Sequence, residues 1–169
     1  MKKYISLAFM AVALSFGFVS CSVETNEEPG GTNVEKMAGR WDVMVDVVDE
    51  SGNIILNDPY SIGKFLFMTY NTADNSINEM WIDDRKNFWQ FNMKVDVNYS
   101  ERTFHCSDRD YDAAGSGTAV VKNGKILENA TKNLHGMPND SIVFDIKFSD
   151  DDYGFIYRIS GQRYTGFYE

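Results

Sequence analysis

The side chains that could carry out hydrolysis are few in this sequence and far apart. Its two histidines, His105 and His135, lie on different segments, and neither sits in a recognised catalytic motif. Ser116 is flanked by glycines but lacks the Gly-x-Ser-x-Gly spacing of a serine nucleophile. Since a nucleophile needs a base within reach, no motif here supports an enzyme. A triad assembled in space from distant segments stays open as an alternative.

Three aspartates at alternate positions, Asp108, Asp110 and Asp112, resemble the opening of a calcium-binding loop. An EF-hand would then need glycine at position 113 and glutamate at position 119, but the chain has Ala113 and Ala119. The few histidines and cysteines do not form a zinc-binding pattern either. We therefore expect no metal and no cofactor, and we interpret the aspartates as part of a solvated loop.

The beginning of the chain predicts export and lipid attachment. Lys2 and Lys3 are followed by an apolar run over residues 4–19. This run is shorter than the roughly 20 residues of a membrane-spanning helix, and a basic start before a short apolar core is typical of a signal peptide. Ser20 and Cys21 then fit cleavage and lipidation of a bacterial lipoprotein. The alternative is an ordinary secretory signal with a chance cysteine.

Cleavage before the cysteine divides the chain into three parts. A signal peptide is removed, a polar segment with several acids and a Pro-Gly-Gly forms a flexible tether, and one domain follows. More than one acyl chain holds a protein stably at a membrane, so we expect a cell-envelope protein, anchored to the outer membrane and facing either side of it. The three parts are residues 1–20, 21–34 and 35–169.

Charge and cysteine content limit the partners of this domain. Loss of Lys2 and Lys3 lowers the net charge from −9 to −11, and such a surface repels nucleic acid and anionic headgroups. We therefore expect no nucleic-acid partner, and membrane attachment through the lipid anchor alone. Cys106 is left without an intramolecular partner, so the domain must be stable without a disulfide.

The domain is rich in segments that predict β-strands. The clearest covers residues 88–97, where apolar side chains alternate with polar ones over ten positions. The Asn-Gly pair at 123–124 predicts a hairpin turn, and only 34–38 and 130–134 could be short helices. Eight to ten strands with short turns indicate an antiparallel barrel or sandwich. The predicted strands are residues 39–48, 54–56, 64–70, 77–83, 88–97, 103–106, 118–121, 126–128, 141–148 and 155–160, and residues 163–168 close the domain.

Two places resemble a known family. Gly39-Arg40-Trp41 matches the Gly-x-Trp motif that opens lipocalins and other calycins. Together with this opening and the leader, residues 159–167 resemble a family of small bacterial lipoproteins described as lipid-binding putative hydrolases. The resemblance implies an all-β, antiparallel, lipocalin-like (calycin-like) barrel of about eight strands. It also implies that Trp41 packs across one barrel end beneath Arg158 or Arg163. A Thr-Asp-Tyr motif, a disulfide and a helix after the last strand are missing, so membership of the true lipocalins is not implied.

A barrel of this size either fills with side chains or holds one small ligand. We expect a lipid or other apolar small molecule, in a cavity lined by one face of the central strands. The candidate lining residues are Phe65, Phe67, Met80, Ile82, Trp89, Phe91, Met93 and Val95.

Two alternatives to a ligand-holding barrel stay open. In the first, the barrel is filled and the protein binds a surface protein or a glycan, with a half-exposed Trp81 as a stacking surface. The second is a hydrolase, which requires His105 or His135 in a cleft beside a Ser, Asp or Glu.

Overall fold

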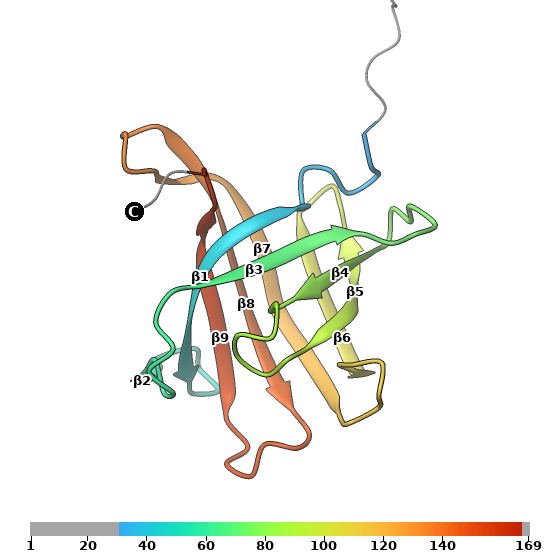
Figure 1. Ribbon diagram of the computed structural model, residues 1–169, viewed down its shortest axis with the longest axis vertical. Helices are drawn as coiled ribbons and strands as arrows, with labels where there is room; N and C mark the ends of the chain where they lie inside the picture. Colours follow the sequence, from blue (N-terminus) through green and yellow to red (C-terminus); the bar gives the residue numbers. More distant parts are fainter. Residues whose placement is uncertain (1–30, 167–169) are drawn as a thin grey trace, which may run out of the picture. The chain divides into compact units, whose positions relative to one another are not determined.

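A computed structural model describes residues 31–166, and in this part of the chain the regular structure consists of strands only. It contains no helix that is long and apolar enough to cross a membrane. The nine strands follow one another around the molecule (Figure 1). They are β1 (Gly39–Val48), β2 (Ile54–Asn57), β3 (Phe65–Asn71), β4 (Glu79–Asp83), β5 (Asn92–Asn98), β6 (Thr103–Asp110), β7 (Thr118–Lys132), β8 (Pro138–Phe148) and β9 (Ile156–Arg163).

The sheet closes on itself because β1 pairs with strands on both of its sides. Sequential strands from β3 to β9 are antiparallel neighbours, and β9 returns to pair with β1 from Trp41↔Arg163 to Val48↔Ile156. On its other side, β1 pairs first with β3 and then, at Asp46–Val48, with the short β2. The result is a closed eight-stranded antiparallel barrel with β2 as an extra strand, which confirms the predicted fold.

The barrel interior is built by alternation along the strands, since successive side chains point to opposite faces of a sheet. On β1, Trp41, Val43 and Val45 are completely buried while Asp42 and Met44 between them are not. Aromatic rings from separate strands meet inside, for example Phe67 with Phe144 at 5.3 Å between centroids. Burial of these apolar side chains is the main source of stability for a domain without a disulfide.

The strand predicted over residues 88–97 is wrong in its first half, because β5 begins only at Asn92. The Asp84 carboxylate accepts hydrogen bonds from the backbone N–H groups of Lys86, Phe88, Trp89 and Gln90, at 2.7–3.0 Å. These donors are therefore turned inward around one side chain instead of toward a neighbouring strand. Gln90 also has a left-handed φ of +59°, outside the extended backbone range of a regular strand.

The hairpin predicted at Asn123-Gly124 is also wrong, since both residues lie inside the long strand β7. Asn123 does take the left-handed conformation that the pair favours, with φ +56°. The register between β7 and β8 shifts between Lys122 and Lys125, so the pair forms a β-bulge and not a chain reversal. The segments at 118–121 and 126–128 are thus one strand.

Three smaller expectations are corrected at the barrel ends. Residues 130–132 belong to β7, and the chain reverses at 133–137, in place of the possible short helix at 130–134. The segment at 34–38 is a tight turn, in which the carbonyl of Val34 accepts from the N–H groups of Met37 and Ala38 at 2.8 and 2.9 Å. The end of the domain, expected as a strand at 155–160 followed by a closing segment at 163–168, contains the single strand β9, which continues through 161–162 and ends at Arg163.

Candidate functional site

One end of the barrel is closed by the residues of the Gly-x-Trp motif. Trp41 is fully buried, and its Nε1 donates to Thr69 Oγ1 at 2.9 Å, while Thr69 donates to the carbonyl of Met37 at 2.6 Å. The Arg163 guanidinium lies 4.4 Å from the centre of the Trp41 ring. A Cβ on Gly39 would overlap the Arg163 guanidinium, so glycine leaves the space that this arginine fills. Gly39, Trp41 and Arg163 are thereby brought together.

Arg163 also ties this closed end to the incoming chain. Its Nη1 donates to the carbonyl of Ala38 at 2.8 Å, and the neighbouring Val34 and Met37 are completely buried in the core. The other candidate arginine for this position, Arg158, lies elsewhere. It forms two hydrogen bonds with Asp145, at 2.8 and 3.0 Å, on the outer side of the barrel.

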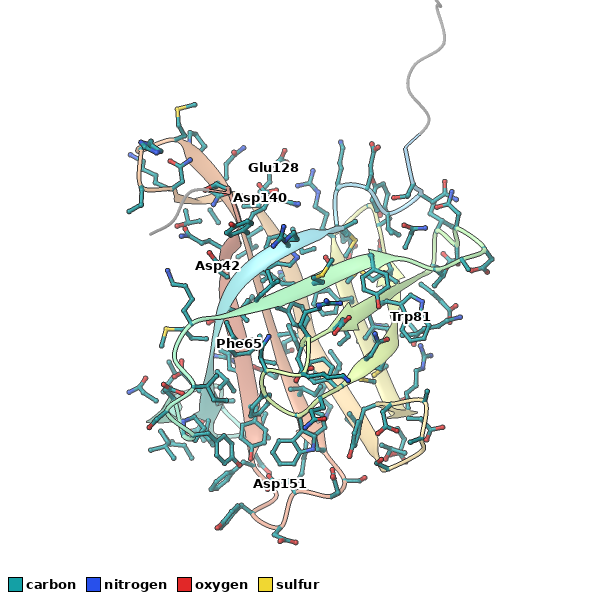
Figure 2. The ribbon with its side chains drawn as sticks, in the orientation of Figure 1. Asp42, Phe65, Trp81, Glu128, Asp140 and Asp151 are labelled. Atoms are coloured by element: carbon teal, nitrogen blue, oxygen red, sulfur yellow. The ribbon has the colours of Figure 1, made fainter. Side chains whose placement is uncertain are left out.

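The opposite end carries a cluster of aromatic rings, which we call the aromatic end. It lies where the β8–β9 connection, marked by Asp151, leaves the barrel (Figure 2). Trp89 stacks on Phe148, with 4.7 Å between centroids and 8° between planes, and Phe88 meets Tyr157 edge-on at 5.1 Å. The rings of the aromatic end are Tyr60, Phe88, Trp89, Phe148, Phe155 and Tyr157.

The aromatic end is graded from buried to exposed. Phe148 and Tyr157 are buried, and Phe88, Trp89 and Phe155 are only partly buried although they pack against the core. Tyr60 is 44% exposed. The cluster therefore presents ring surface both to the barrel interior and to the outside.

Two aspartates hold the polar atoms of these rings. Asp150 accepts from Trp89 Nε1 at 3.2 Å and from the Tyr111 hydroxyl at 2.8 Å. Asp151 accepts from the Tyr157 hydroxyl at 3.1 Å, and that hydroxyl lies 2.8 Å from the hydroxyl of Tyr60. These contacts orient the rings and leave the apolar faces free to pack.

Burial changes the ionisation of Tyr157 in the aromatic end and of Tyr111, which packs edge-on against Phe148 at 5.5 Å. Burial, followed by the hydrogen bond to Asp150, raises the pKa of Tyr111 to about 12. The pKa of Tyr157 is also raised, by burial first and then by its contacts with Tyr60 and Asp151. Both phenols therefore stay neutral at physiological pH and act as hydrogen-bond donors to carboxylates, not as bases.

The segment 84–91 carries Phe88 and Trp89 over the aromatic end. Asp84 holds this segment in place. Its side chain is completely buried and accepts hydrogen bonds from four backbone N–H groups of the segment. Burial raises the pKa of Asp84, while the hydrogen bonds from Lys86 and Phe88 oppose this shift. Arg85 and Lys86 also have positive φ values, +54° and +64°, so the chain reverses direction tightly at this point. This reversal lets several backbone N–H groups point at the single Asp84 carboxylate.

The candidate cavity residues occupy the barrel interior, apart from Trp89 in the 84–91 segment. An internal void wide enough for water would expose its lining, yet these interior side chains have almost no exposed surface. The described barrel is therefore filled at its centre by its own side chains. The values are 0% for Phe67, Met80, Ile82, Phe91 and Val95, 1% for Met93 and 7% for Phe65.

The four hollows characterised in the described part of the molecule open to its outer surface. The largest of those characterised has a volume of about 520 Å³ and contains the Arg158–Asp145 pair with Lys122 and Lys147. His105 and His135 are exposed and line none of these hollows. Within residues 31–166, no three His, Cys, Asp or Glu side chains are arranged to hold a metal ion.

Most rings of the aromatic end are absent from the site residues that the sequence predicts. Of its six members only Trp89 is among them, because the predicted cavity residues are those at alternating apolar positions of the central strands. The signal that could have found the others, apart from Tyr60, is the concentration of Phe, Trp and Tyr beside the aspartate-rich turns at 83–84 and 150–152. Cys21, the predicted lipidation site, lies outside the described residues.

Comparison with known proteins places this geometry in a family. A family model described as "Lipid-binding putative hydrolase" matches residues 26–168, which confirms the resemblance drawn from the two ends of the domain. A comparison with curated proteins gave no match.

Proposed function

Because the chain belongs to the lipid-binding putative hydrolase family, we propose that it binds the acyl chain of a lipid, or a similar apolar molecule, at the aromatic end of its barrel. The observation that carries the proposal is a group of partly exposed rings that pack on one another at one end of the barrel, continuous with the apolar core. Apolar surface with a few fixed polar groups is the usual composition of a small-molecule site.

The strand β2 adds an apolar wall beside these rings. Leu56 pairs with Val47 across the two strands, so both side chains lie on the same face of the sheet. Val47 is 1% exposed, whereas Leu56 is 46% exposed. The inner face of the sheet thus continues from the buried Val47 to Leu56, whose apolar side chain is exposed to solvent. This exposed apolar surface favours binding of an apolar ligand at this end.

The filled interior determines how such a ligand would bind. An acyl chain lies against Trp89, Phe88 and Tyr60, or enters where Trp89 now stacks on Phe148. The second route requires the 84–91 segment to move, with Asp84 as the fixed point. The apolar surface buried against the chain supplies the binding free energy, about 0.8 kcal/mol for each CH₂ removed from water.

Fluorescence quenching by a brominated fatty acid tests this location. We expect dibromostearate to quench Trp89 saturably, because the bromines come into contact with its ring. The Trp81→Phe variant should keep this quenching, and Trp89→Phe should lose it, with unbrominated stearate as the control for both. Equal quenching in the two variants, or no saturable quenching, would contradict the proposed site.

We further propose that the protein reaches its lipid as an anchored lipoprotein of the cell envelope. The support is the leader sequence and its Cys21. Metabolic labelling with an alkyne-tagged fatty acid should modify the full-length chain and leave Cys21→Ala unlabelled. Labelling of Cys21→Ala would exclude this cysteine as the attachment site.

A further inference from the structure

A row of outward-facing side chains crosses the barrel wall at β3, β4 and β5, away from the aromatic end. The register places Tyr70 beside Trp81 and Trp81 beside Lys94. The Tyr70 and Trp81 rings are nearly parallel, 21° apart with 6.4 Å between centroids, and Lys94 Nζ lies 5.8 Å from the Trp81 ring centre. Trp81 is partly exposed on this side of the barrel (Figure 2).

The indole of Trp81 forms one wall of a hollow of about 340 Å³. The other side of the hollow comes from the β6–β7 region, with Asp110 and Asp112, and Asn92 and Arg109 also line it. This volume lies within the range of small-molecule sites, which begins near 300 Å³. An aromatic face and several hydrogen-bonding groups thus meet in one concave place.

The polar groups of the hollow are held in position by their neighbours. Asn92 Nδ2 donates to the Tyr70 hydroxyl at 2.9 Å and to Asp83 at 3.2 Å. Arg109 donates to Asp96 at 3.0 Å and to the carbonyl of Lys94 at 3.2 Å. Fixed donors and acceptors of this kind lose little conformational entropy when a ligand binds.

Charge in the hollow is largely balanced within the protein. Lys94 pairs with Glu79 at 3.3 Å, and Arg109 pairs with Asp96. The remaining carboxylates, Asp110 and Asp112, make the lining slightly acidic. An anionic ligand is therefore disfavoured, while groups that donate hydrogen bonds to carboxylates are favoured.

We propose that this hollow, the Trp81 site, binds a neutral sugar ring of a glycan. A pyranose has one face of C–H groups that packs on an indole ring, and hydroxyls at its edge that both donate and accept hydrogen bonds. The Trp81 site offers both kinds of partner, with Asn92, Asp110 and Asp112 at the edge of the aromatic surface. A long acyl chain would cover these polar groups with hydrocarbon and remove their remaining contact with water, at a cost in free energy.

The test is titration of the full domain with neutral hexasaccharides of glucose, mannose, galactose and xylose, followed by tryptophan fluorescence and calorimetry. At least one of them should bind saturably. Trp81→Ala should weaken that binding at least 10-fold, and Trp81→Phe should weaken it less. The exposed aromatic Tyr153, in the β8–β9 connection and outside the lining of the hollow, supplies the matched control Tyr153→Ala, which should bind normally.

A blocking variant separates loss of the site from loss of the fold. Ala113 is exposed and lines the hollow, so Ala113→Tyr should abolish sugar binding and leave the thermal midpoint unchanged. The proposal is overturned if no hexasaccharide binds, or if binding survives both Trp81→Ala and Ala113→Tyr. Because dibromostearate reports on Trp89, failure of the Trp81 site is distinguishable from failure of the aromatic end.

Discussion

Tyr157 in the aromatic end and Tyr111, which packs against Phe148 of that end, each combine an apolar ring with a fixed hydroxyl. Each donates a hydrogen bond to an aspartate of the β8–β9 connection, Asp150 or Asp151. In both cases burial is the first cause of a raised pKa. The folded state therefore holds the neutral phenol more strongly than the unfolded chain does, and this difference links stability to pH.

We expect the protein to lose stability in alkali through these two groups. The contribution is fully present below about pH 10, where unfolded tyrosines are neutral. It is lost as the pH rises from about 10 toward the pKa of Tyr111 at about 12. Urea unfolding midpoints at about pH 9 and about pH 11 should therefore differ less in Tyr111→Phe than in the unmodified protein.

Tyr153→Phe is the control for this comparison, because Tyr153 is 74% exposed. It should behave as the unmodified protein does at both pH values. An unchanged pH dependence in Tyr111→Phe would show that this phenol does not carry the linkage.

At the scale of elements, the sequence predicted where strands occur better than where they bend. Alternation located β1 and β8 almost to their ends, since both line the core on one face. The same alternation at 88–91 was misleading, because one carboxylate, Asp84, gathers the backbone donors of that segment. At Asn123-Gly124 the local conformation was foreseeable, but whether it makes a turn or a bulge depends on pairing with distant strands.

Removal of the Asp84 side chain should release the 84–91 segment. Asp84→Ala leaves the N–H groups of Phe88, Trp89 and Gln90 without their acceptor. Loss of a buried charged acceptor costs about 2–3 kcal/mol, and chemical denaturation should show a destabilisation of that size. Amide hydrogen exchange at residues 86–90 should become faster.

Lys86→Ala, on the same segment, keeps the carboxylate and serves as the control. If exchange at residues 86–90 were as slow in Asp84→Ala as in Lys86→Ala, another contact would have to hold the segment. The acyl-chain proposal would then lose the shift about Asp84 on which its second route depends.

The whole molecule depends on closure between the first and last strands. Gly161 of β9 lies opposite Val43 of β1, where the two backbones approach closely. A Cβ at position 161 would overlap the carbonyl oxygen of Asp42 and lie 2.6 Å from Val43 Cα. The resemblance at the two ends of the chain anticipated closure, whereas the degree of interior filling depends on the packing of every strand and could not be derived from one sequence.

Gly161→Ala should therefore destabilise the entire barrel, by about 3 kcal/mol, the upper range for overpacking a well-packed core. Gly63→Ala is the matched control, because Gly63 has a φ of +70° and a Cβ added there would meet no atom within 4 Å. Its cost should be about 1 kcal/mol, from the left-handed backbone alone. Equal losses in thermal unfolding would mean that β1 and β9 do not approach as closely as described.

The central claim, that an apolar ligand binds at the aromatic end, is tested most directly by photo-crosslinking. A phosphatidylcholine with a diazirine in one acyl chain is added to the purified domain, irradiated, and its adducts are located by mass spectrometry. We expect adducts at Phe88, Trp89, Tyr60 or Phe155, and competition by unlabelled lipid. Adducts confined to the outer strand surfaces, or insensitive to competition, would contradict the account.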